Sequence, residues 1–326
     1  MELSSSFESR IELTKLKEKT DAIKRVSNSI LVGQQKLFDL MLTALLADGH
    51  ILIEGVPGIA KTLAAKVMAK LIDADFSRIQ FTPDLMPSDV LGTSVYNMKK
   101  SEFEFKKGPL FSNVVLIDEI NRSPAKTQAA LFEVMEERQI SIDGNTYPMD
   151  PLYIVLATQN PIEQEGTYKL PEAQLDRFLF KLNIGYLSKS DEVEILNRHH
   201  ENIHLADVSS LKSEIKAQDI IEFRSMIKDV HVEKNLIQYI AEIIEETRNN
   251  KAIYLGASPR AGIGMLNGSK AFAALKGRDF VTPEDIKFIA EPVLNHRLML
   301  TPESEMEGNR IVDICNKILE KIEVPR

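Results

Sequence analysis

The 326-residue sequence has little cysteine, no long apolar segment and no excess of basic residues. Its single cysteine, Cys315, excludes an intramolecular disulfide and fits a reducing cytosol. No apolar run approaches the roughly 18 residues of a membrane-spanning helix. The first six residues have neither the basic nor the apolar region of a secretory signal. We therefore expect a cytoplasmic protein that reaches a membrane only through a partner.

The charge balance is acidic, with 40 Lys and Arg against 48 Asp and Glu and a net charge of −8. This balance gives no general electrostatic footprint for nucleic acid, so we expect no nucleic-acid partner. Two lysine pairs, Lys99-Lys100 and Lys106-Lys107, are the only hint of DNA contact, and such lysines usually solvate an exposed hairpin. Hydrophobic content of 44% predicts a soluble globular protein with a substantial core.

Short apolar runs alternate with helical periods over the first 187 residues. Several of the runs are continuously apolar, which is typical of parallel strands buried on both faces by helices. We expect strands near residues 51–53, 76–81, 114–117, 153–157 and 178–182, and helices near 7–29, 35–47, 63–71 and 124–137.

Local signals add detail to this α/β region. Alternation around Phe103-Glu104-Phe105 and the turn at 143–145 predict two exposed hairpins. Residues 82–89 contain two prolines and should form no regular element. Ser123 should cap a helix whose first residue is Pro124.

After about residue 188 the sequence shows helical periods without clear buried strands. Ser258-Pro259 and Thr282–Asp285 have the form of helix starts. We therefore expect residues 188–326 to be an all-helical domain that follows an α/β domain at 1–187. The expected helices lie near 191–200, 220–228, 234–248, 259–274, 283–294 and 311–319.

A glycine loop, Gly55–Thr62, joins the first strand to a helix, which is the context of a phosphate-binding loop. Lys61 would reach the terminal phosphates, and the Thr62 hydroxyl would hold Mg²⁺. Ala60 replaces the glycine of the usual pattern, and a methyl group is acceptable there if φ stays negative. The expected phosphate-binding residues are Gly55, Pro57, Gly58, Ile59, Ala60, Lys61, Thr62 and Leu63.

Polar residues end two of the buried strands. Asp118 would bind Mg²⁺ and Glu119 would polarise the attacking water, because carboxylates at the ends of parallel strands face the ligand crevice. Asn160 could hydrogen-bond both that water and the γ-phosphate, although an asparagine before proline is also a common turn former.

Two arginines are further candidates. Arg177 could stabilise charge on a γ-phosphate, in its own subunit or in a neighbour, or simply pair with Asp176. Arg260 lies in the first turn of a helix, where cations are disfavoured, so an anionic partner is expected: a phosphate or a nearby Glu. His199, His200 and His204 lack an accompanying carboxylate motif, and we interpret them as surface residues rather than a metal site.

Together these motifs resemble the AAA+ ATPases, and most closely their MoxR branch. The segments that carry the resemblance are 55–62, 116–122, 157–161, 170–178 and 256–260. The resemblance implies an α/β P-loop NTPase core of AAA+ type, with a parallel sheet between helices, followed by an all-helical lid.

The resemblance also implies roles. Lys61, Thr62, Asp118 and Glu119 would be the Walker residues, Asn160 sensor 1, and Arg260 sensor 2 in the lid, acting in cis or in trans. Arg177 would be an arginine finger for the adjacent subunit. Val32-Gly33-Gln34 would contact the adenine, and the hairpins would be inserts that face a central pore.

Three functions follow for comparison. The first is a Mg²⁺-dependent ATPase that forms a homo-oligomeric ring, hexameric as the resemblance implies, and remodels or matures a client with a von Willebrand factor A domain partner. The second is a nucleotide-dependent switch or scaffold with little turnover, which need not keep Glu119. The third is a nucleic-acid motor, which the acidic balance disfavours.

Overall fold

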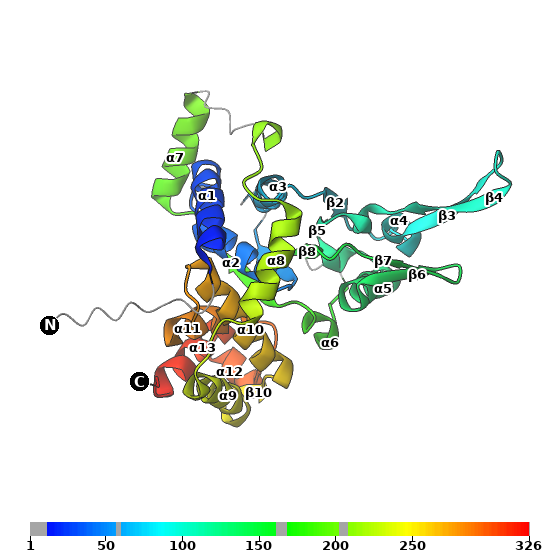
Figure 1. The fold of residues 1–326 in the computed structure, drawn as a ribbon. Helices are drawn as coiled ribbons and strands as arrows, with labels where there is room; N and C mark the ends of the chain where they lie inside the picture. Colours follow the sequence, from blue (N-terminus) through cyan, green and yellow to red (C-terminus); the bar gives the residue numbers. More distant parts are fainter. Residues whose placement is uncertain (1–11, 57–59, 161–167, 202–207, 326) are drawn as a thin grey trace.

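The computed structural model describes residues 12–56, 60–160, 168–201 and 208–325 (Figure 1). Part of the helix expected at 7–29 and the loop residues Pro57, Gly58 and Ile59 lie outside these ranges, as does His204. The helix expected first in the chain is described from Thr14 to Ile30.

A parallel sheet is the centre of the α/β region. Its described strands have the order β2-β5-β8-β1-β9, and each neighbouring pair is parallel. The predicted parallel sheet is therefore confirmed, although β9 begins two residues later than expected. The strands are β1 (Ile51–Gly55), β2 (Phe76–Gln80), β5 (Val114–Asp118), β8 (Ile154–Gln159) and β9 (Phe180–Ile184).

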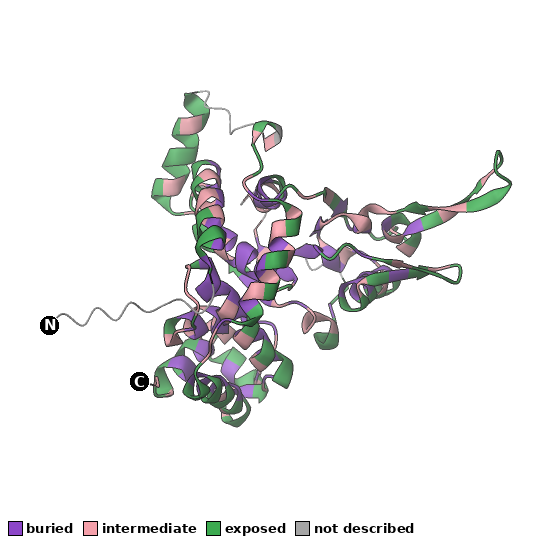
Figure 2. Ribbon diagram, viewed as in Figure 1, coloured by how far each residue is buried: buried purple, intermediate pink, exposed green. Residues whose placement is uncertain are grey.

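Alternate strand residues face two different hydrophobic clusters. Leu116 and Leu156 belong to the cluster that contains α1 to α3 and the C-terminal helices, whereas Val115 and Val155 belong to the cluster that contains α5. Burial on both faces explains why the central strands β5 and β8 begin with continuous apolar runs (Figure 2). The helices of this region are α1 (Thr14–Ile30), α2 (Gln35–Leu46), α3 (Lys61–Leu71), α4 (Pro87–Leu91), α5 (Ala125–Glu137) and α6 (Glu172–Leu175).

Both predicted hairpins are confirmed: β3 (Gly92–Asn97) pairs with β4 (Glu102–Lys107), and β6 (Gln139–Ile142) pairs with β7 (Asn145–Pro148). Asp143 and Gly144 both have positive φ, 51° and 78°, as a tight hairpin turn requires. The hairpins project side by side from the body (Figure 1). They are joined by a Ser94–Asp143 hydrogen bond of 2.6 Å and by stacking of Phe105 on Tyr147.

Two expectations at prolines are wrong. Residues 82–89 are not wholly irregular, because Pro87 begins α4; a proline fits the first helical position, where no backbone donor is needed. Ser123 does not cap α5. Pro124 precedes the helix and its carbonyl accepts the amide of Thr127, whereas the buried Ser123 hydroxyl has no hydrogen-bond partner among the described residues.

The C-terminal region is helical, as expected, with one addition. β10 (Ile253–Leu255) and β11 (Met299–Leu300) form a short antiparallel ribbon that the sequence did not reveal. No helix in the described ranges is long and apolar enough to cross a membrane. The helices are α7 (Lys189–His200), α8 (Ala217–Lys228), α9 (Lys234–Asn249), α10 (Pro259–Leu275), α11 (Pro283–Leu294), α12 (Pro302–Met306) and α13 (Ile311–Lys321).

His50 joins the sheet to α5 from a fully buried position. Its Nδ1 accepts the amide hydrogen of Val155 at 3.0 Å, and its Nε2 lies 3.3 Å from the carbonyl oxygen of Met135. Burial, with a smaller contribution from Arg138, lowers the pKa of His50 to about 3. The folded protein therefore keeps this histidine neutral at pH values where the unfolded chain binds a proton.

This difference predicts a loss of stability in mild acid. Between pH 6.5 and pH 5 the unfolded state gains a proton that folded His50 does not, which lowers the free energy of unfolding by about 2 kcal/mol. The His50→Gln variant should be less stable at pH 7 but should lose less stability over this interval. Urea denaturation at pH 7, 6 and 5 measures both effects. His199→Gln, at an exposed position, is the control; an equal pH slope in all three proteins would contradict the assignment.

Candidate active site

The glycine loop connects β1 to α3 at the carboxyl edge of the sheet. Gly55 is the last residue of β1, and Lys61 is the first residue of α3. The Lys61 ammonium donates a hydrogen bond of 2.7 Å to the carbonyl oxygen of Gly55, so its side chain reaches back across the loop. Burial lowers the pKa of Lys61, and the carboxylates of Asp118, Glu119 and Glu54 oppose this shift. The ammonium therefore lies at the carboxyl end of β1, against the Gly55 carbonyl oxygen and near three carboxylates.

Ala60 has a left-handed backbone, with φ 60° and ψ 20°. The expectation that φ would stay negative there is therefore wrong. Ala60 immediately precedes the first helical residue of α3, so the left-handed conformation lies at the start of the helix. A Cβ in the left-handed region costs roughly 1–2 kcal/mol, so the loop is strained at Ala60.

Replacement of Ala60 by glycine should relieve this strain. We expect Ala60→Gly to raise the free energy of unfolding by about 1 kcal/mol and to leave nucleotide affinity unchanged. Ala64→Gly, in the right-handed interior of α3, is the matched control and should lower stability by about 1 kcal/mol. Denaturant unfolding measures both changes. Equal destabilisation by the two substitutions would show that Ala60 is not strained.

The two carboxylates at the end of β5 have separate environments. The Asp118 carboxylate is almost buried; its Oδ2 accepts a 2.6 Å hydrogen bond from Arg78 Nε, and its Oδ1 accepts one of 3.2 Å from the Thr158 hydroxyl. Glu119 has a left-handed backbone, φ 57°, which turns it out of the strand direction. Its amide donates to the Thr158 Oγ1 at 3.1 Å, so Thr158 holds both acidic residues in place.

Glu119 is engaged by two side chains. Its Oε2 accepts a 2.9 Å hydrogen bond from the Gln80 amide and lies 3.1 Å from Arg122 Nε. Arg78 and Gln80 are the functional candidates that sequence reasoning missed. Both lie on β2, opposite Leu116 and Asp118 of β5 in the pairing register. The available signal was that these two polar residues stand at alternate positions of a predicted strand. The sequence did not show which other strand would lie beside it in the sheet.

A pocket of about 410 Å³ brings most of the predicted phosphate-site residues together. Two of its walls come from the loop and α3, and the others from β2, β5 and β8. Pro57, Gly58 and Ile59 lie outside the described residues. The predicted residues that line the pocket are Gly55, Ala60, Lys61, Thr62, Leu63, Asp118, Glu119 and Asn160.

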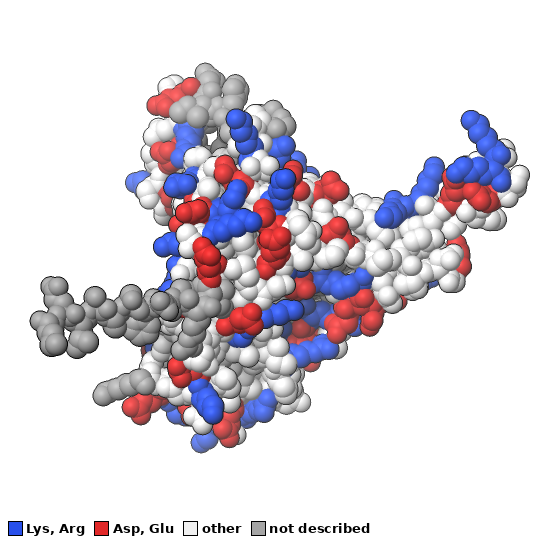
Figure 3. Space-filling view, in the orientation of Figure 1, with Lys and Arg blue, Asp and Glu red and all other residues white. Residues whose placement is uncertain are grey.

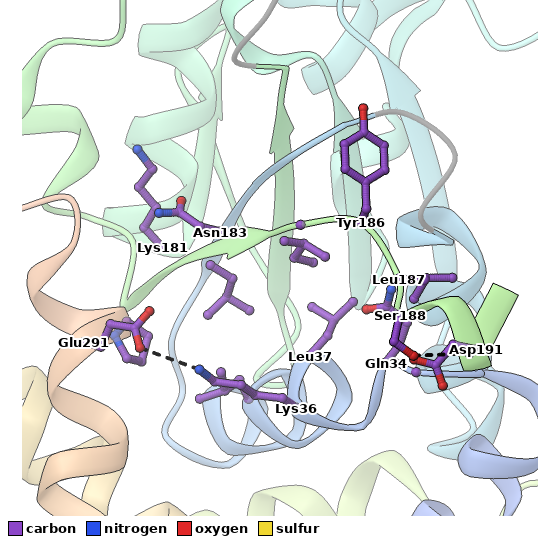
Figure 4. Close-up of a pocket in the computed structure, with 16 residues that line it drawn as sticks. Gln34, Lys36, Leu37, Lys181, Asn183, Tyr186, Leu187, Ser188, Asp191 and Glu291 are labelled. Atoms are coloured by element: carbon purple, nitrogen blue, oxygen red, sulfur yellow. Dashed lines mark hydrogen bonds and ion pairs between the residues drawn. The ribbon is translucent and has the colours of Figure 1, made fainter. Parts of the chain in front are cut away.

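Gly33 and Gln34, the expected adenine contacts, line a second pocket of about 220 Å³ (Figure 4). Gly33 has φ 71°, a left-handed backbone that favours glycine, and a Cβ there would lie 2.8 Å from the Asp191 carboxylate. Ile184 lines this pocket and pairs in register with Gly55, which lines the phosphate pocket. The two pockets therefore have lining residues on the neighbouring strands β1 and β9.

Arg177 and Arg260 do not line either pocket; they lie together beside the end of α5. The Arg177 guanidinium donates to the carbonyl oxygen of Phe132 and lies 3.9 Å from the Glu136 carboxylate. Arg260 lies 3.2 Å from the same carboxylate and 3.9 Å from Asp176. Arg260 therefore has a glutamate partner, which was one of the two expectations for it. Asp176 pairs with Arg297 and not with Arg177.

The pocket suits a magnesium ion bound together with phosphates. Mg²⁺ prefers oxygen ligands and usually keeps several waters, so few protein ligands are needed. The Thr62 hydroxyl and the Asp118 carboxylate line the same pocket. Among the described residues no group of three or more His, Cys, Asp or Glu could hold a metal elsewhere.

The fold and the pocket define a P-loop nucleotide-binding core with a helical lid. Residues 50–180 match the model of the ATPase family associated with various cellular activities (AAA), and residues 245–318 match the AAA lid domain.

Three similar proteins extend this match to almost the whole chain. An uncharacterized protein of Bacillus subtilis, YeaC, is 46% identical and the alignment covers 91% of this chain and 92% of that one. Chaperone MoxR1 of Mycobacterium tuberculosis is 42% identical, with 91% and 80% covered. The crystal structure of a candidate ATPase from Cytophaga hutchinsonii is 44% identical, with a TM-score of 0.87 and 97% and 96% covered. The chain therefore belongs to the MoxR family of AAA+ ATPases.

Proposed function

We propose that this protein hydrolyses ATP with Mg²⁺ as a subunit of a ring, of six copies as the family resemblance implies, and uses the energy to remodel or mature a client protein. The observation that supports hydrolysis best is the single pocket that holds Lys61, Thr62, Asp118, Glu119 and Asn160. A protein that only binds nucleotide has no need of a carboxylate positioned as Glu119 is.

The chemistry assigned to these residues is transfer of the γ-phosphoryl group of ATP to water. Lys61 binds the terminal phosphates, and Thr62 and Asp118 hold Mg²⁺, which neutralises charge on the β- and γ-phosphate oxygens. Glu119 orients and polarises the attacking water once its contacts with Gln80 and Arg122 are released. The Asn160 amide bonds the same water without competing for its proton. Gly33 and Gln34 contact the adenine in the adjoining pocket.

We assign Arg177 and Arg260 to the site of the neighbouring subunit. Within their own subunit they lie beside Glu136, outside the phosphate pocket, and they lie close enough together to share that carboxylate. Two guanidinium groups at one place suit a γ-phosphate that develops charge during transfer. A head-to-tail arrangement of subunits would present both groups to the next pocket.

The two projecting hairpins are the surface that we assign to the client. Met98 and Phe103, at the far end of the β3/β4 hairpin, are 87% and 73% exposed. Both basic and acidic side chains lie at the outer end of this hairpin (Figure 3). Exposed large apolar side chains rimmed by charge are typical of protein-binding sites. A relative named Chaperone MoxR1 is consistent with a protein client.

Other parts of the proposal rest on the family resemblance and on composition. We assign residues 1–187 to the nucleotide-binding domain and 188–326 to the lid, and the two family-model matches fall on either side of that boundary. We expect a partner with a von Willebrand factor A domain. We place the activity in the cytoplasm, where ATP is available.

The role of Glu119 is tested by Glu119→Gln. This substitution keeps size and hydrogen bonding but removes the charge, so ATP should bind with nearly wild-type affinity while turnover falls by about 100-fold or more. Titration with a fluorescent ATP analogue and steady-state phosphate release measure the two quantities. Glu133→Gln, at an exposed position on α5, is the control. Retained turnover would mean that another residue orients the water.

Ring formation and the role of Arg177 are tested together. Specific ATPase activity should rise with protein concentration and then saturate, because each site needs a neighbour. Arg177→Ala should bind ATP but lose about 1,000-fold in turnover, and mixing it with Glu119→Gln should restore part of the activity. Arg310→Ala, an exposed arginine paired with Asp313, is the control. Activity independent of concentration, with no recovery on mixing, would exclude a finger in trans.

A further inference from the structure

The segment that carries Arg177 is held by two consecutive lid residues that follow α11. His296 and Arg297 both reach across to residues 176–179, between α6 and β9. The Nε2 of His296 lies 2.8 Å from the carbonyl oxygen of Phe178. Burial, together with the charge of Arg297, holds the pKa of His296 well below its usual value, so this nitrogen carries a proton in a neutral ring and donates it.

Arg297 makes the larger set of contacts. Its Nε donates to the Asp176 carboxylate at 2.6 Å. Nη1 donates to the carbonyl oxygens of Leu179 and Val293 at 3.1 and 2.7 Å, and Nη2 donates to those of Asp176 and Phe178 at 3.2 and 2.7 Å. A guanidinium has five N–H donors, and here every one of them has an acceptor.

This arrangement fixes the backbone on both sides of Arg177. Asp176 precedes it and Phe178 follows it, and both give their carbonyl oxygens to Arg297. The Arg297 side chain is only 5% exposed, so loss of a partner would leave a buried polar group unsatisfied. Asp176 also lies near Arg260, so the contacts of Arg297 extend to the second candidate arginine.

We propose that Arg297 is a positioning residue that fixes Arg177 to the lid of its own subunit, so that the lid sets the position of the finger in the neighbouring site. This inference rests on the proposed action of Arg177 in trans. Its consequence is directional: a nucleotide-dependent movement of one lid displaces the finger that acts on the next subunit. Arg297 itself touches no substrate.

Arg297→Lys tests this role in the full-length chain. Lysine keeps the charge but has three donors from one atom, and it cannot reproduce the planar set of five. We expect binding of a fluorescent ATP analogue to change by less than about twofold while turnover falls by about 10- to 100-fold, as for a catalytic group displaced by about an ångström. Mixed with Glu119→Gln, the variant should recover activity, because Glu119→Gln subunits supply intact fingers to its intact pockets.

The mixture has a quantitative expectation. In a 1:1 mixture with random assembly in closed rings, roughly a quarter of all sites combine an intact pocket with an intact neighbouring finger. Specific activity should therefore approach roughly a quarter of the wild-type value, calculated over all subunits.

Arg224→Lys is the matched control. Arg224, on α8, is also nearly buried and also joins the C-terminal region to the core; it bonds the carbonyl oxygens of Leu45 and Pro151 and the Asp48 carboxylate. None of these groups belongs to residues 176–179. Arg224→Lys should lower the thermal midpoint about as much as Arg297→Lys does. Any activity it loses should not return on mixing with Glu119→Gln.

The outcomes distinguish failure of the proposed finger, Arg177, from failure of the proposed role of Arg297. If Arg177→Ala keeps full activity, the proposed finger is wrong and the inference falls with it. Suppose instead that Arg177→Ala is inactive and that mixing with Glu119→Gln restores its activity. The role of Arg297 alone is then overturned if Arg297→Lys is fully active, or if it is inactive and mixing does not restore its activity. If Arg297→Lys does not fold, Asp176→Asn removes the charged acceptor at nearly constant size. The same loss and rescue would then support the proposal, and their absence would overturn it.

Discussion

The carboxyl ends of three adjacent parallel strands determine the site. β1, β8 and β5 are neighbours in the sheet, so the glycine loop after β1, Asn160 after β8 and the carboxylates at the end of β5 meet at one edge. Thr158 connects two of these elements directly, because its hydroxyl contacts the Asp118 carboxylate and accepts the amide of Glu119. Strand order and register therefore decide which side chains meet in the pocket.

The charged residues of the pocket already have partners within the chain. Lys61 bonds the Gly55 carbonyl, Asp118 pairs with Arg78, and Glu119 pairs with Gln80 and Arg122. Arg122 and Glu119 are both partly exposed, and an ion pair of this kind contributes about 0–1 kcal/mol. In the function proposed above, nucleotide and metal would replace these contacts. The same contacts keep like charges neutralised, and they hold the carboxylates in one geometry before substrate arrives.

The sequence predicted the parts of the site that lie in continuous motifs. Apolar runs predicted the strands, and the loop and acidic residues followed from their positions at strand ends. The sequence did not reveal Arg78 and Gln80, because strand order decides that β2 lies beside β5. The positive φ of Ala60 was also missed, since a residue name does not state a dihedral angle. The contacts of Arg260 depend on how the lid packs on the core, and those of Arg177 depend on how the segment before β9 packs on α5. No local pattern encodes either packing.

The placement of the arginines constrains how subunits can cooperate. The pocket lies at the carboxyl edge of the sheet, whereas Arg177 and Arg260 lie at the end of α5, attached to the lid through Asp176 and Arg297. If these arginines act on a neighbour, each subunit supplies its two arginines from one surface and accepts those of another subunit at a different surface. This arrangement requires a heterologous contact between subunits. Such contacts close into a ring when the rotation allows it. The surface that supplies the arginines is bound to the lid, and the surface that accepts them contains the nucleotide. The effect of nucleotide state on turnover in the next subunit then passes around the ring in one direction only.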